Sequence, residues 1–370
     1  MNRKAFGVGV IDFFSGCGGT SAGLRKAGLK IVLGIDNDPD AGYSFAANFP
    51  ESQMLRRDVR YLETAAINDA IMAANEPFLL FSACAPCQPF SKQRRGRRAQ
   101  DPRANLLSQF TRFIRRYRPE YILVENVPGF QSLSADQGPF AKFQKALTDM
   151  KYEVDTGVVD CRHYGVPQQR NRLILLASAL GPIRIPPGTF SPDKPHASFA
   201  TVRDWIGHLP PIVAGETHPV VPLHRAAGLS SLNLQRIRAT PEGGGREHWP
   251  RRLLAQCHRG GYDGHIDVYS RLSWDGSAPG LTTRCISFSN GRFGHPDQDR
   301  ALSVREAALI QTFPLDFHFI GSLNSMARQI GNAVPVLLAE AIGAAVLKHA
   351  AKRYRARQVW HPSRSTVQET

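Results

Sequence analysis

Apolar runs, turn residues and helix signals alternate over the first sixty residues, and this order restricts the fold more than any other feature. The run 8–14 predicts a buried strand, and the glycine-rich turn 15–21 follows it directly. A helix is expected over 22–27, before a second apolar run at 31–35. A strand, a glycine turn, a helix, a strand and then an acid are typical of a doubly wound nucleotide-binding sheet. The sequence therefore predicts an α/β fold built on a Rossmann-like sheet.

The glycine turn departs from the pattern that binds dinucleotides. Gly16 and Gly18 match the first two glycines of G-x-G-x-x-G, but Ser21 stands at the third. A pyrophosphate needs close approach to the helix N-terminus, so this departure favours a nucleoside ligand without a phosphate. Asp36 lies where an acid would accept hydrogen bonds from ribose hydroxyls, and Asp58 could accept one from an adenine amino group. Each acid alone could equally be solvated at a strand end, but together with the glycine turn they favour ligand contact.

The segment 81–91, which reads FSACAPCQPFS, contains the end of another predicted strand. The apolar run 78–81 predicts a buried strand. Pro86 and Pro89 end it and stiffen the turn, because each proline fixes φ and lacks an N–H. Cys87 therefore sits just past a strand end, where open α/β sheets carry their ligand and catalytic sites.

Cys87 has three alternative interpretations at this point. A reactive thiol needs an electropositive surrounding, and the basic residues that follow are Lys92, Arg94, Arg95, Arg97 and Arg98. A buried, inert cysteine is the commoner case for a single thiol. Cys84 and Cys87 also form a C-x-x-C pair, but zinc would need two further ligands. The remaining cysteines are scattered singly: Cys17, Cys161, Cys257 and Cys285. Zinc is therefore disfavoured, while a redox pair stays open on spacing alone.

The charge balance points to a polyanionic partner. The 370 residues include 46 Lys and Arg against 31 Asp and Glu, a formal net charge of +15. Such an excess favours nucleic acid or an anionic membrane, although general solubility is an alternative. No apolar run reaches the roughly 18–20 residues of a spanning helix. The N-terminal residues lack a signal peptide's cleavage pattern, and the cysteines fit reduced thiols, so we expect a cytoplasmic protein.

Further charged residues are expected at the active edge of the sheet. Glu125 follows the apolar run 121–124, although a glutamate there could simply be a helix cap or a loop acid. Arg170 and Arg172 precede the apolar run 173–177, and strand alternation places them on one face. Two guanidinium groups on one face predict an anionic or carbonyl-bearing partner rather than a core position.

Other expected elements are helices at 106–117, 140–150, 302–312 and 327–345, the last interrupted at 331–335, and strands at 54–59 and 152–160. The basic segment 88–105 has no clear periodicity and is interpreted as a functional loop, with a helix start at Asp101-Pro102.

A shift to proline and glycine around 181–195 predicts a domain boundary. We expect a first domain at 1–186 that is completed by 322–350, a second at 187–321, and a basic tail at 351–370. The second domain carries glycines, arginines and tryptophans that suit contacts with nucleic acid, although an ordinary irregular domain is the alternative.

Seven stretches occur in an order that resembles the cytosine-5 DNA methyltransferases of bacterial restriction–modification systems, over nearly the whole chain. They are DFFSGCGG at 12–19, DND at 36–38, PCQPFS at 86–91, ENV at 125–127, QQRNR at 168–172, the segment 305–314, and QIGNAVP at 329–335. The resemblance implies a Rossmann-like S-adenosylmethionine-dependent catalytic domain, a smaller target-recognition domain and a DNA cleft between them. Two departures are Ala85, where many members have proline, and a short recognition region at 187–281.

The resemblance also implies catalytic roles. Cytosine C5 is a poor nucleophile, and attack of a thiolate on C6 makes it reactive, so covalent catalysis divides one hard step into easier ones. By resemblance Cys87 is that nucleophile. Glu125 would hydrogen-bond the base at N3 and its amino group, Arg172 would contact O2, and Arg170 would support it near the thiol. The basic loop would close over the flipped base.

The implied cofactor is S-adenosyl-L-methionine. By resemblance Phe14 would stack on its adenine, Asp36 would hold the ribose and Asp58 the adenine, while Asn332 would lie near the methionine end. The other residues expected at the cofactor are Gly16, Gly18, Gly19, Asn37, Val59 and Pro86. No metal is expected.

The implied partner is a specific double-stranded DNA sequence, read by a monomer. A cognate restriction endonuclease would act on the same site without direct contact. Two alternatives remain: a cytosine-5 methyltransferase of transfer RNA, and a non-catalytic nucleic-acid-binding protein on the same scaffold.

Overall fold

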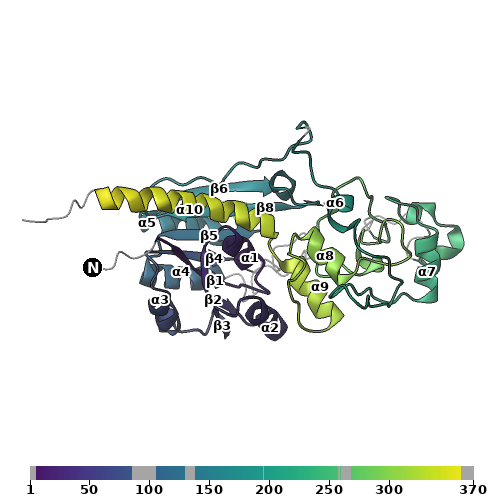
Figure 1. The fold of residues 1–370 in the computed structure, drawn as a ribbon, viewed down its shortest axis with the longest axis horizontal. Coiled ribbons are helices and arrows are strands. Elements are labelled where there is room, and N and C mark those ends of the chain that lie inside the picture. The colour runs from purple at the N-terminus through teal and green to yellow at the C-terminus, as the bar shows by residue number, and fades with distance from the viewer. Residues whose placement is uncertain are drawn as a thin grey trace, which may run out of the picture.

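A computed structural model describes residues 6–85, 106–129, 138–194, 196–256, 259 and 268–359. Within these residues the main feature is a seven-stranded sheet with the order β3-β2-β1-β4-β5-β8-β6 (Figure 1). Its strands are β1 (Val8–Phe13), β2 (Lys30–Asp36), β3 (Gln53–Arg56), β4 (Phe78–Ala83), β5 (Tyr121–Asn126), β6 (Glu153–Asp160) and β8 (Asn171–Ser178).

The strand order creates a crevice beside β1. The first five strands are mutually parallel, whereas β8 runs antiparallel to both β5 and β6. The chain moves outward from β1 to β2 and β3, and then returns to β4 on the other side of β1. Such a reversal opens a crevice at the carboxyl ends of the flanking strands, which is where open α/β sheets bind ligands.

Helices cover both faces of the sheet, and strand alternation supplies each face with apolar side chains. Val8 and Val10 of β1 face one core, with α1 (Gly19–Lys26) and α10 (Val336–Val359) packed over it. Phe13 faces the other core with aromatic residues of α4 (Leu106–Tyr117) and α5 (Pro139–Asp149). Helix α3 (Asn68–Ala74) completes this second layer (Figure 1). β1 is therefore buried along its whole length.

The remaining helices are shorter. They are α2 (Pro39–Asn48), α6 (Val202–Ile206), α7 (Ser231–Arg238), α8 (Val304–Ile310) and α9 (Leu323–Asn332). Asp38 caps α2, because its carboxylate accepts hydrogen bonds from the backbone N–H groups of Asp40 and Ala41. No single helix in the described ranges is long and apolar enough to cross a membrane. The bent pair of α9 and α10 together has the length and composition of a membrane span.

The C-terminal helix returns to the start of the chain. α10 runs against α1 at Gly23, where the absence of a side chain permits the close approach. A Cβ at this position would clash with the carbonyl oxygen of Val336 and lie 2.5 Å from the Cβ of Ala339. Helices far apart in sequence thus form the helical layer on one face of the sheet.

Most expected elements are confirmed, with some differences in their bounds. The strand expected at 54–59 ends at Arg56, so Asp58 lies in the turn after β3. Helix α3 was not expected, nor were α6 and α7. The segment 88–105 and its expected helix start at Asp101-Pro102 lie outside the described residues. The domain boundaries stay a prediction.

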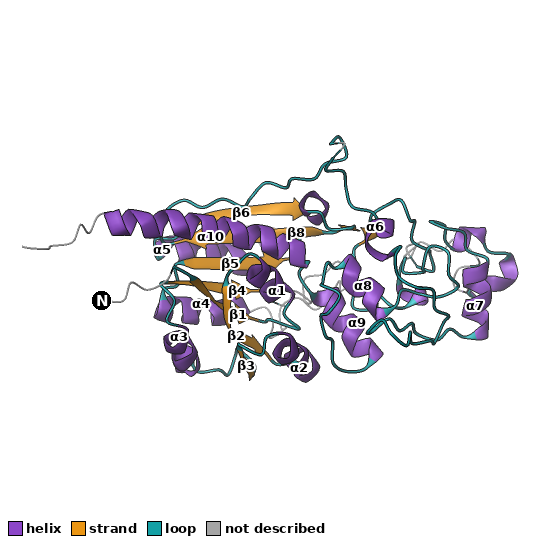
Figure 2. Ribbon diagram, viewed as in Figure 1, coloured by secondary structure: helices purple, strands orange, loops and turns teal. Residues whose placement is uncertain are grey.

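Residues 187–321 contain few strands in their described part (Figure 2). Only β9 (Ala278–Pro279) is a named strand in that part, and it pairs with β7 (Gln168–Gln169) from outside the region. Short 3-10 turns cover Arg246–His248, Arg251–Leu253 and Phe288–Asn290. A region with so little sheet needs other cross-links between its loops.

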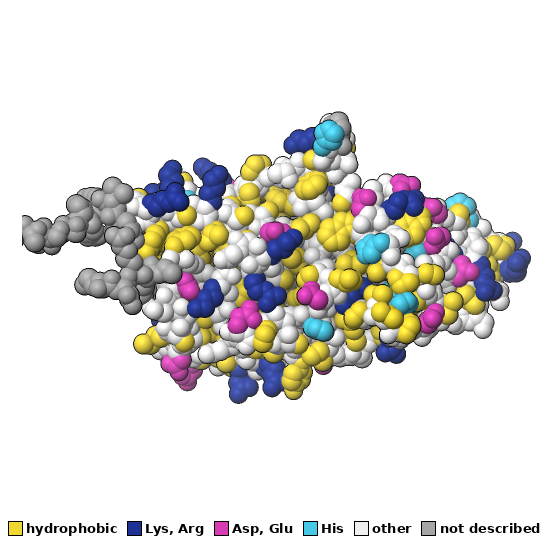
Figure 3. Space-filling model, in the orientation of Figure 1, with side chains coloured by type: hydrophobic (Ala, Val, Ile, Leu, Met, Phe, Trp, Pro, Cys, Tyr) yellow, Lys and Arg dark blue, Asp and Glu magenta, His cyan; other side chains and the backbone are white. Residues whose placement is uncertain are grey.

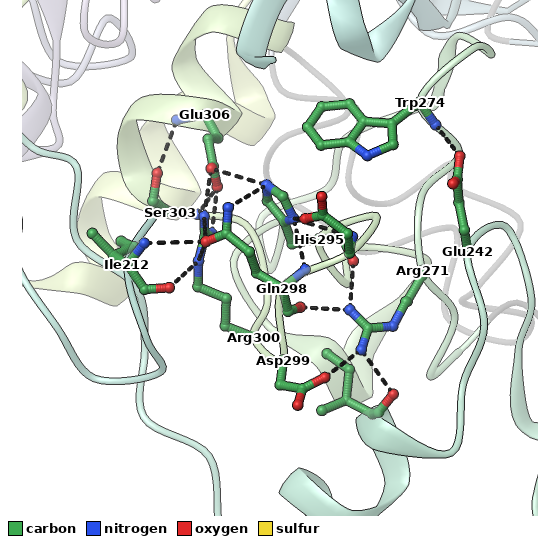
Figure 4. Close-up of polar contacts among 12 residues, drawn as sticks. Ile212, Glu242, Arg271, Trp274, His295, Gln298, Asp299, Arg300, Ser303 and Glu306 are labelled. Carbon is green, nitrogen blue, oxygen red and sulfur yellow. Dashed lines mark hydrogen bonds and ion pairs between the residues drawn. The ribbon is translucent and has the colours of Figure 1, made fainter. Parts of the chain in front are cut away.

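Buried charges supply one such cross-link (Figure 4). Arg300 is fully buried, and its guanidinium donates to both carboxylate oxygens of Glu306 at 2.7 Å. Glu306 also accepts from the backbone N–H of Ser303, whose hydroxyl caps α8 in return. One carboxylate therefore fixes a helix start and neutralises a buried cation.

His295 lies against this pair as a neutral side chain. Its Nε2 is 3.5 Å from Glu306, and its Nδ1 accepts from the backbone N–H groups of Asp297 and Gln298. Burial lowers the pKa of His295 to about 4, and this effect outweighs the nearby carboxylate. Arg271 donates to the His295 carbonyl and to Asp299, which ties the same loop to its neighbours.

Acid should destabilise the protein through His295. The unfolded side chain takes up a proton below its ordinary pKa of about 6.5, whereas the folded one does so only near 4. The stabilisation is complete above pH 6.5 and is lost as the pH falls towards 4. From pH 7 to pH 5 we expect a loss of about 2 kcal/mol that His295→Gln does not show. Urea unfolding at several pH values measures the difference. His208→Gln, at an exposed position, is the control and should follow the wild type.

Gly23→Ala should destabilise the contact between α1 and α10. Alanine is favoured over glycine inside a helix by about 1 kcal/mol, so a gain is expected from propensity alone. The clash with α10 should outweigh it and give a net loss of about 1–3 kcal/mol. Gly228→Ala is a control for the added methyl group alone, since Gly228 lies outside the helices and its Cβ would meet no atom within 4 Å. Equal unfolding midpoints for the two variants would contradict the proposed packing.

Candidate active site

A cavity of about 660 Å³ opens at the carboxyl ends of β1, β2, β4 and β5. It therefore occupies the crevice that the strand order creates. Phe14 and Asp36 line one end, following β1 and ending β2. Glu125 and Arg172 line the other end, on β5 and β8. An aromatic ring with a carboxylate and a carboxylate with a guanidinium thus line one continuous space.

The turn after β1 holds the Asp36 carboxylate in place. Gly16, at φ 54°, donates its backbone N–H to one oxygen at 2.9 Å. The N–H of Asp38 donates to the other oxygen at 2.8 Å. Burial raises the pKa of Asp36, against the effect of these bonds. The Ser15 hydroxyl beside it is buried and has no hydrogen-bond partner among the described residues, so it is available to a ligand.

Gly18 and Gly19 serve close packing. Gly18 has φ 98°, and a Cβ there would clash with the ring of Phe49. A Cβ on Gly19 would lie 2.8 Å from the carbonyl oxygen of Val334. Gly19 lines the cavity and Gly18 does not. The contacts expected of Gly18 and Gly19 with a cofactor stay predictions.

Asp58 is already engaged by a neighbour. Arg60 holds its carboxylate with two nitrogens, Nε at 3.1 Å and Nη2 at 2.6 Å. These hydrogen bonds lower the pKa of Asp58. Asn37 donates weakly to the same group at 3.5 Å, and Val59 also lines the cavity. The role expected for Asp58 toward an adenine stays a prediction, and it requires sharing the carboxylate with Arg60.

Glu125 is the centre of the deep end. Its Oε1 lies 2.5 Å from Nε of Arg172, and its Oε2 accepts from the Cys84 thiol at 2.7 Å. The strands position all three, since Glu125 lies on β5, Cys84 directly follows β4, and Arg172 lies on β8. Both members of the ion pair are largely removed from water. Electrostatic interactions are stronger in such a place than at the surface.

Arg170 lies beside Arg172 and is turned toward the backbone. It donates to the carbonyl oxygens of Leu281 at 2.7 Å, Gly331 at 2.9 Å and Ala333 at 3.3 Å. Burial lowers its pKa to about 9. Its Nε, also buried, has no partner among the described residues. These contacts indicate that Arg170 positions two segments of the cavity wall, the loop after β9 and the α9–α10 junction.

The junction between α9 and α10 forms part of that wall. Asn332 lines the cavity together with Thr282 and Thr283, and its expected place near the methionine end stays a prediction. Gly331 packs so closely that a Cβ would clash with the Thr282 carbonyl and lie 2.6 Å from the Thr283 nitrogen. A glycine is therefore required for the two segments to meet.

Cys87 and Pro86, both expected in the site, lie outside the described residues. Three described cysteines are poor candidates for the nucleophile, because burial raises the pKa of Cys17, Cys161 and Cys285 to about 12. Sequence reasoning missed Ser15 and the contact of Cys84 with Glu125. The sequence does contain a signal for Cys84, because this residue follows a predicted strand and so lies at the active edge of the sheet. The sequence analysis considers Cys84 only as one member of a C-x-x-C pair.

Comparisons with known proteins agree with this arrangement. The family model of the C-5 cytosine-specific DNA methylases matches residues 8–348. A Type II methylase of Herpetosiphon aurantiacus is 39% identical over 346 residues, covering 91% of this chain and 94% of the relative. A Type II methyltransferase of Haemophilus parahaemolyticus is 33% identical, covering 91% and 86%.

Solved structures show the same fold. A protein from E. coli, described as a prophage-encoded DNA modification methyltransferase, has a TM-score of 0.70 at 24% identity and covers 92% of this chain and 99% of its own. The Dnmt2 methyltransferase of S. pombe has a TM-score of 0.61 at 18% identity, covering 93% and 98%. With the family model matching most of its length, the chain belongs to the C-5 cytosine-specific DNA methylase family and is a DNA (cytosine-5)-methyltransferase.

Proposed function

We propose that the enzyme transfers a methyl group from S-adenosyl-L-methionine to C5 of a cytosine flipped out of a specific double-stranded DNA sequence. The transfer passes through a covalent bond between Cys87 and C6 of the base. One observation carries this proposal. A single cavity joins the Asp36 carboxylate to the Glu125–Arg172 pair, so a nucleoside and a polar base can meet within it.

The cofactor end of the cavity suits a nucleoside without phosphates. Asp36 is held by two backbone N–H groups and can accept from ribose hydroxyls. The unpartnered hydroxyl of Ser15 adds a further polar contact, and Phe14 adds an aromatic surface. Asn332 also lines the cavity, and it would contact the amino-acid end. When bound, S-adenosyl-L-methionine supplies an electrophilic methyl group.

Glu125 and Arg172 are suited to stabilise the activated base. Attack of the Cys87 thiolate on C6 moves electron density toward N3 and O2 of the ring. Arg172 would donate to O2, and Glu125 would hydrogen-bond N3 and the exocyclic amine. Fixed groups in a water-poor site stabilise such charge strongly. Because Glu125 and Arg172 contact each other in the structure, the base must enter between them or share their hydrogen-bonding groups.

The target base must leave the helix to reach this depth, at a cost of a few kcal/mol in lost stacking. Positive charge would help to hold the distorted DNA. On the face seen in Figure 3, Lys and Arg are interspersed with Asp and Glu and form no single stripe. The densest basic run, at 92–98, lies outside the described residues.

The bacterial relatives carry the names Type II methylase and Type II methyltransferase, which supports pairing with a restriction endonuclease that reads the same sequence. One chain provides both ends of the cavity. We therefore propose that it acts as a monomer, without contact to the endonuclease. Bisulfite sequencing of DNA from cells that express the protein would identify the target.

Cys87→Ser should abolish methyl transfer to duplex DNA, because a hydroxyl at this position is a far weaker nucleophile. Incorporation of label from S-adenosyl-L-methionine measures the loss, and a transfer RNA substrate run in parallel tests the alternative acceptor. A 5-fluorocytosine duplex should trap the wild type as a covalent adduct and leave the variant free. Undiminished transfer by Cys87→Ser would refute the assigned nucleophile.

Arg172→Lys should lower the rate of methyl transfer by about 10²–10³ while DNA binding changes little. A lysine keeps the charge but loses the planar group that reaches Glu125 and the base together. Single-turnover rates and DNA affinities separate the two effects. Arg184→Lys is the control, because Arg184 pairs with Asp155 at an exposed position. Similar rates for both variants would exclude the role of Arg172.

A further inference from the structure

Glu125 is held from two sides at the deep end of the cavity. Arg172 on β8 contacts Oε1, and the thiol of Cys84 donates to Oε2 at 2.7 Å. The last torsion angle of a glutamate side chain is broad, so a carboxyl group with a single partner keeps part of its rotational freedom. Two contacts, one on each oxygen and from different elements of the sheet, fix the plane of the carboxyl group.

The sheet itself places Cys84 beside Glu125. β4 and β5 pair in parallel, with Ala83 opposite Val124 at the end of the ladder. This register, continued by one residue, puts Cys84 next to Glu125 on the same face of the sheet. The backbone N–H of Cys84 also donates to the carbonyl oxygen of Phe13 on β1, at 3.4 Å. The backbone that carries the thiol is therefore held by both neighbouring strands.

Cys84 faces the substrate space as well as its glutamate partner. It is only partly buried, and it lines the main cavity together with Glu125 and Arg172. Packing accounts for its contact with the apolar core on one face of the sheet, but not for a thiol directed at a carboxylate oxygen. Because a thiol is a weak hydrogen-bond donor, it can orient Glu125 without binding its charge as firmly as a second cation would.

We propose that Cys84 is a positioning residue for Glu125, and that its thiol holds the carboxyl group in the orientation that meets N3 and the amino group of the target cytosine. The inference rests on the proposed role of Glu125 toward the base. A carboxylate has about four lone-pair sites, two on each oxygen. The contacts with Cys84 and Arg172 therefore leave one site on each oxygen for the base or for a proton. Cys84 forms no bond to the substrate and acts through Glu125.

Replacement of Cys84 by alanine and by serine separates the hydrogen bond from packing. The two replacements are nearly equal in size, and only serine keeps a donor. Because the Sγ–Oε2 distance is short, a hydroxyl on its shorter bond still reaches Oε2. We expect Cys84→Ala to lower the single-turnover rate of methyl transfer about 10- to 100-fold, through misplacement of Glu125. Cys84→Ser should recover most of that rate.

The affinities for DNA and for S-adenosyl-L-methionine should change little in both variants. The contact lies at the Glu125 end of the cavity, whereas Asp36 lines the other end. Cys84→Thr and Cys84→Val repeat the comparison with a larger pair of equal shape, which covers the case that a small side chain disturbs folding. The threonine variant should then be the faster of the two.

Cys285 is the matched control, since its buried thiol donates instead to the carbonyl oxygen of Ala327 at 3.6 Å. Its alanine and serine variants should transfer the methyl group at equal rates. Equal rates for Cys84→Ala and Cys84→Ser, at any level, or a slower serine variant, would overturn the positioning role and leave the proposed function standing. If the wild type transfers no methyl group and forms no adduct, the proposed function fails, and this inference fails with it.

Discussion

The guanidinium group of Arg170 holds together three parts of the chain that are distant in sequence. It leaves the sheet between β7 and β8, and it binds carbonyl groups at Leu281, Gly331 and Ala333. These carbonyls belong to the loop after β9 and to the junction of α9 with α10. Because a buried cation without partners is very costly, these two segments are held around it. The wall of the active site therefore depends on an interaction that does not itself require substrate.

The sheet and the region 187–321 solve different physical problems. Parallel strands buried on both faces are stabilised by apolar packing along their whole length. The loop-rich region has a small apolar cluster of its own around Ile237, Trp249 and Phe288, and others of its apolar side chains, such as Phe293 and Leu302, join the core on one face of the sheet. It adds the buried Arg300–Glu306 pair with His295 beside it. Removing one member of such a group leaves an uncompensated charge, so the network favours one arrangement of its loops.

Much of the first region follows from local sequence. Apolar runs with glycine and proline boundaries predicted β1, β2 and β5, and the order of motifs placed Asp36 and Glu125 at one edge. The contacts that determine the role of each polar side chain join residues that are distant in sequence or depend on the fold. No local sequence pattern predicts them. Ser21 was interpreted as a missing glycine, yet its hydroxyl binds Asp12. The pairing of Asp58 with Arg60 and the direction of Arg170 likewise depend on the folded neighbours.

The tight contact at Gly331 has a consequence for changing what the enzyme reads. At Gly331, no side chain fits between the α9–α10 junction and the turn that begins at Thr282–Thr283. The C-terminal border of the expected recognition region, 187–281, thus meets the α9–α10 junction with no room for a side chain, and the same contact carries two of the carbonyls bound by Arg170. A foreign recognition region transplanted from a relative would have to reproduce this contact atom by atom, whatever bases its loops select.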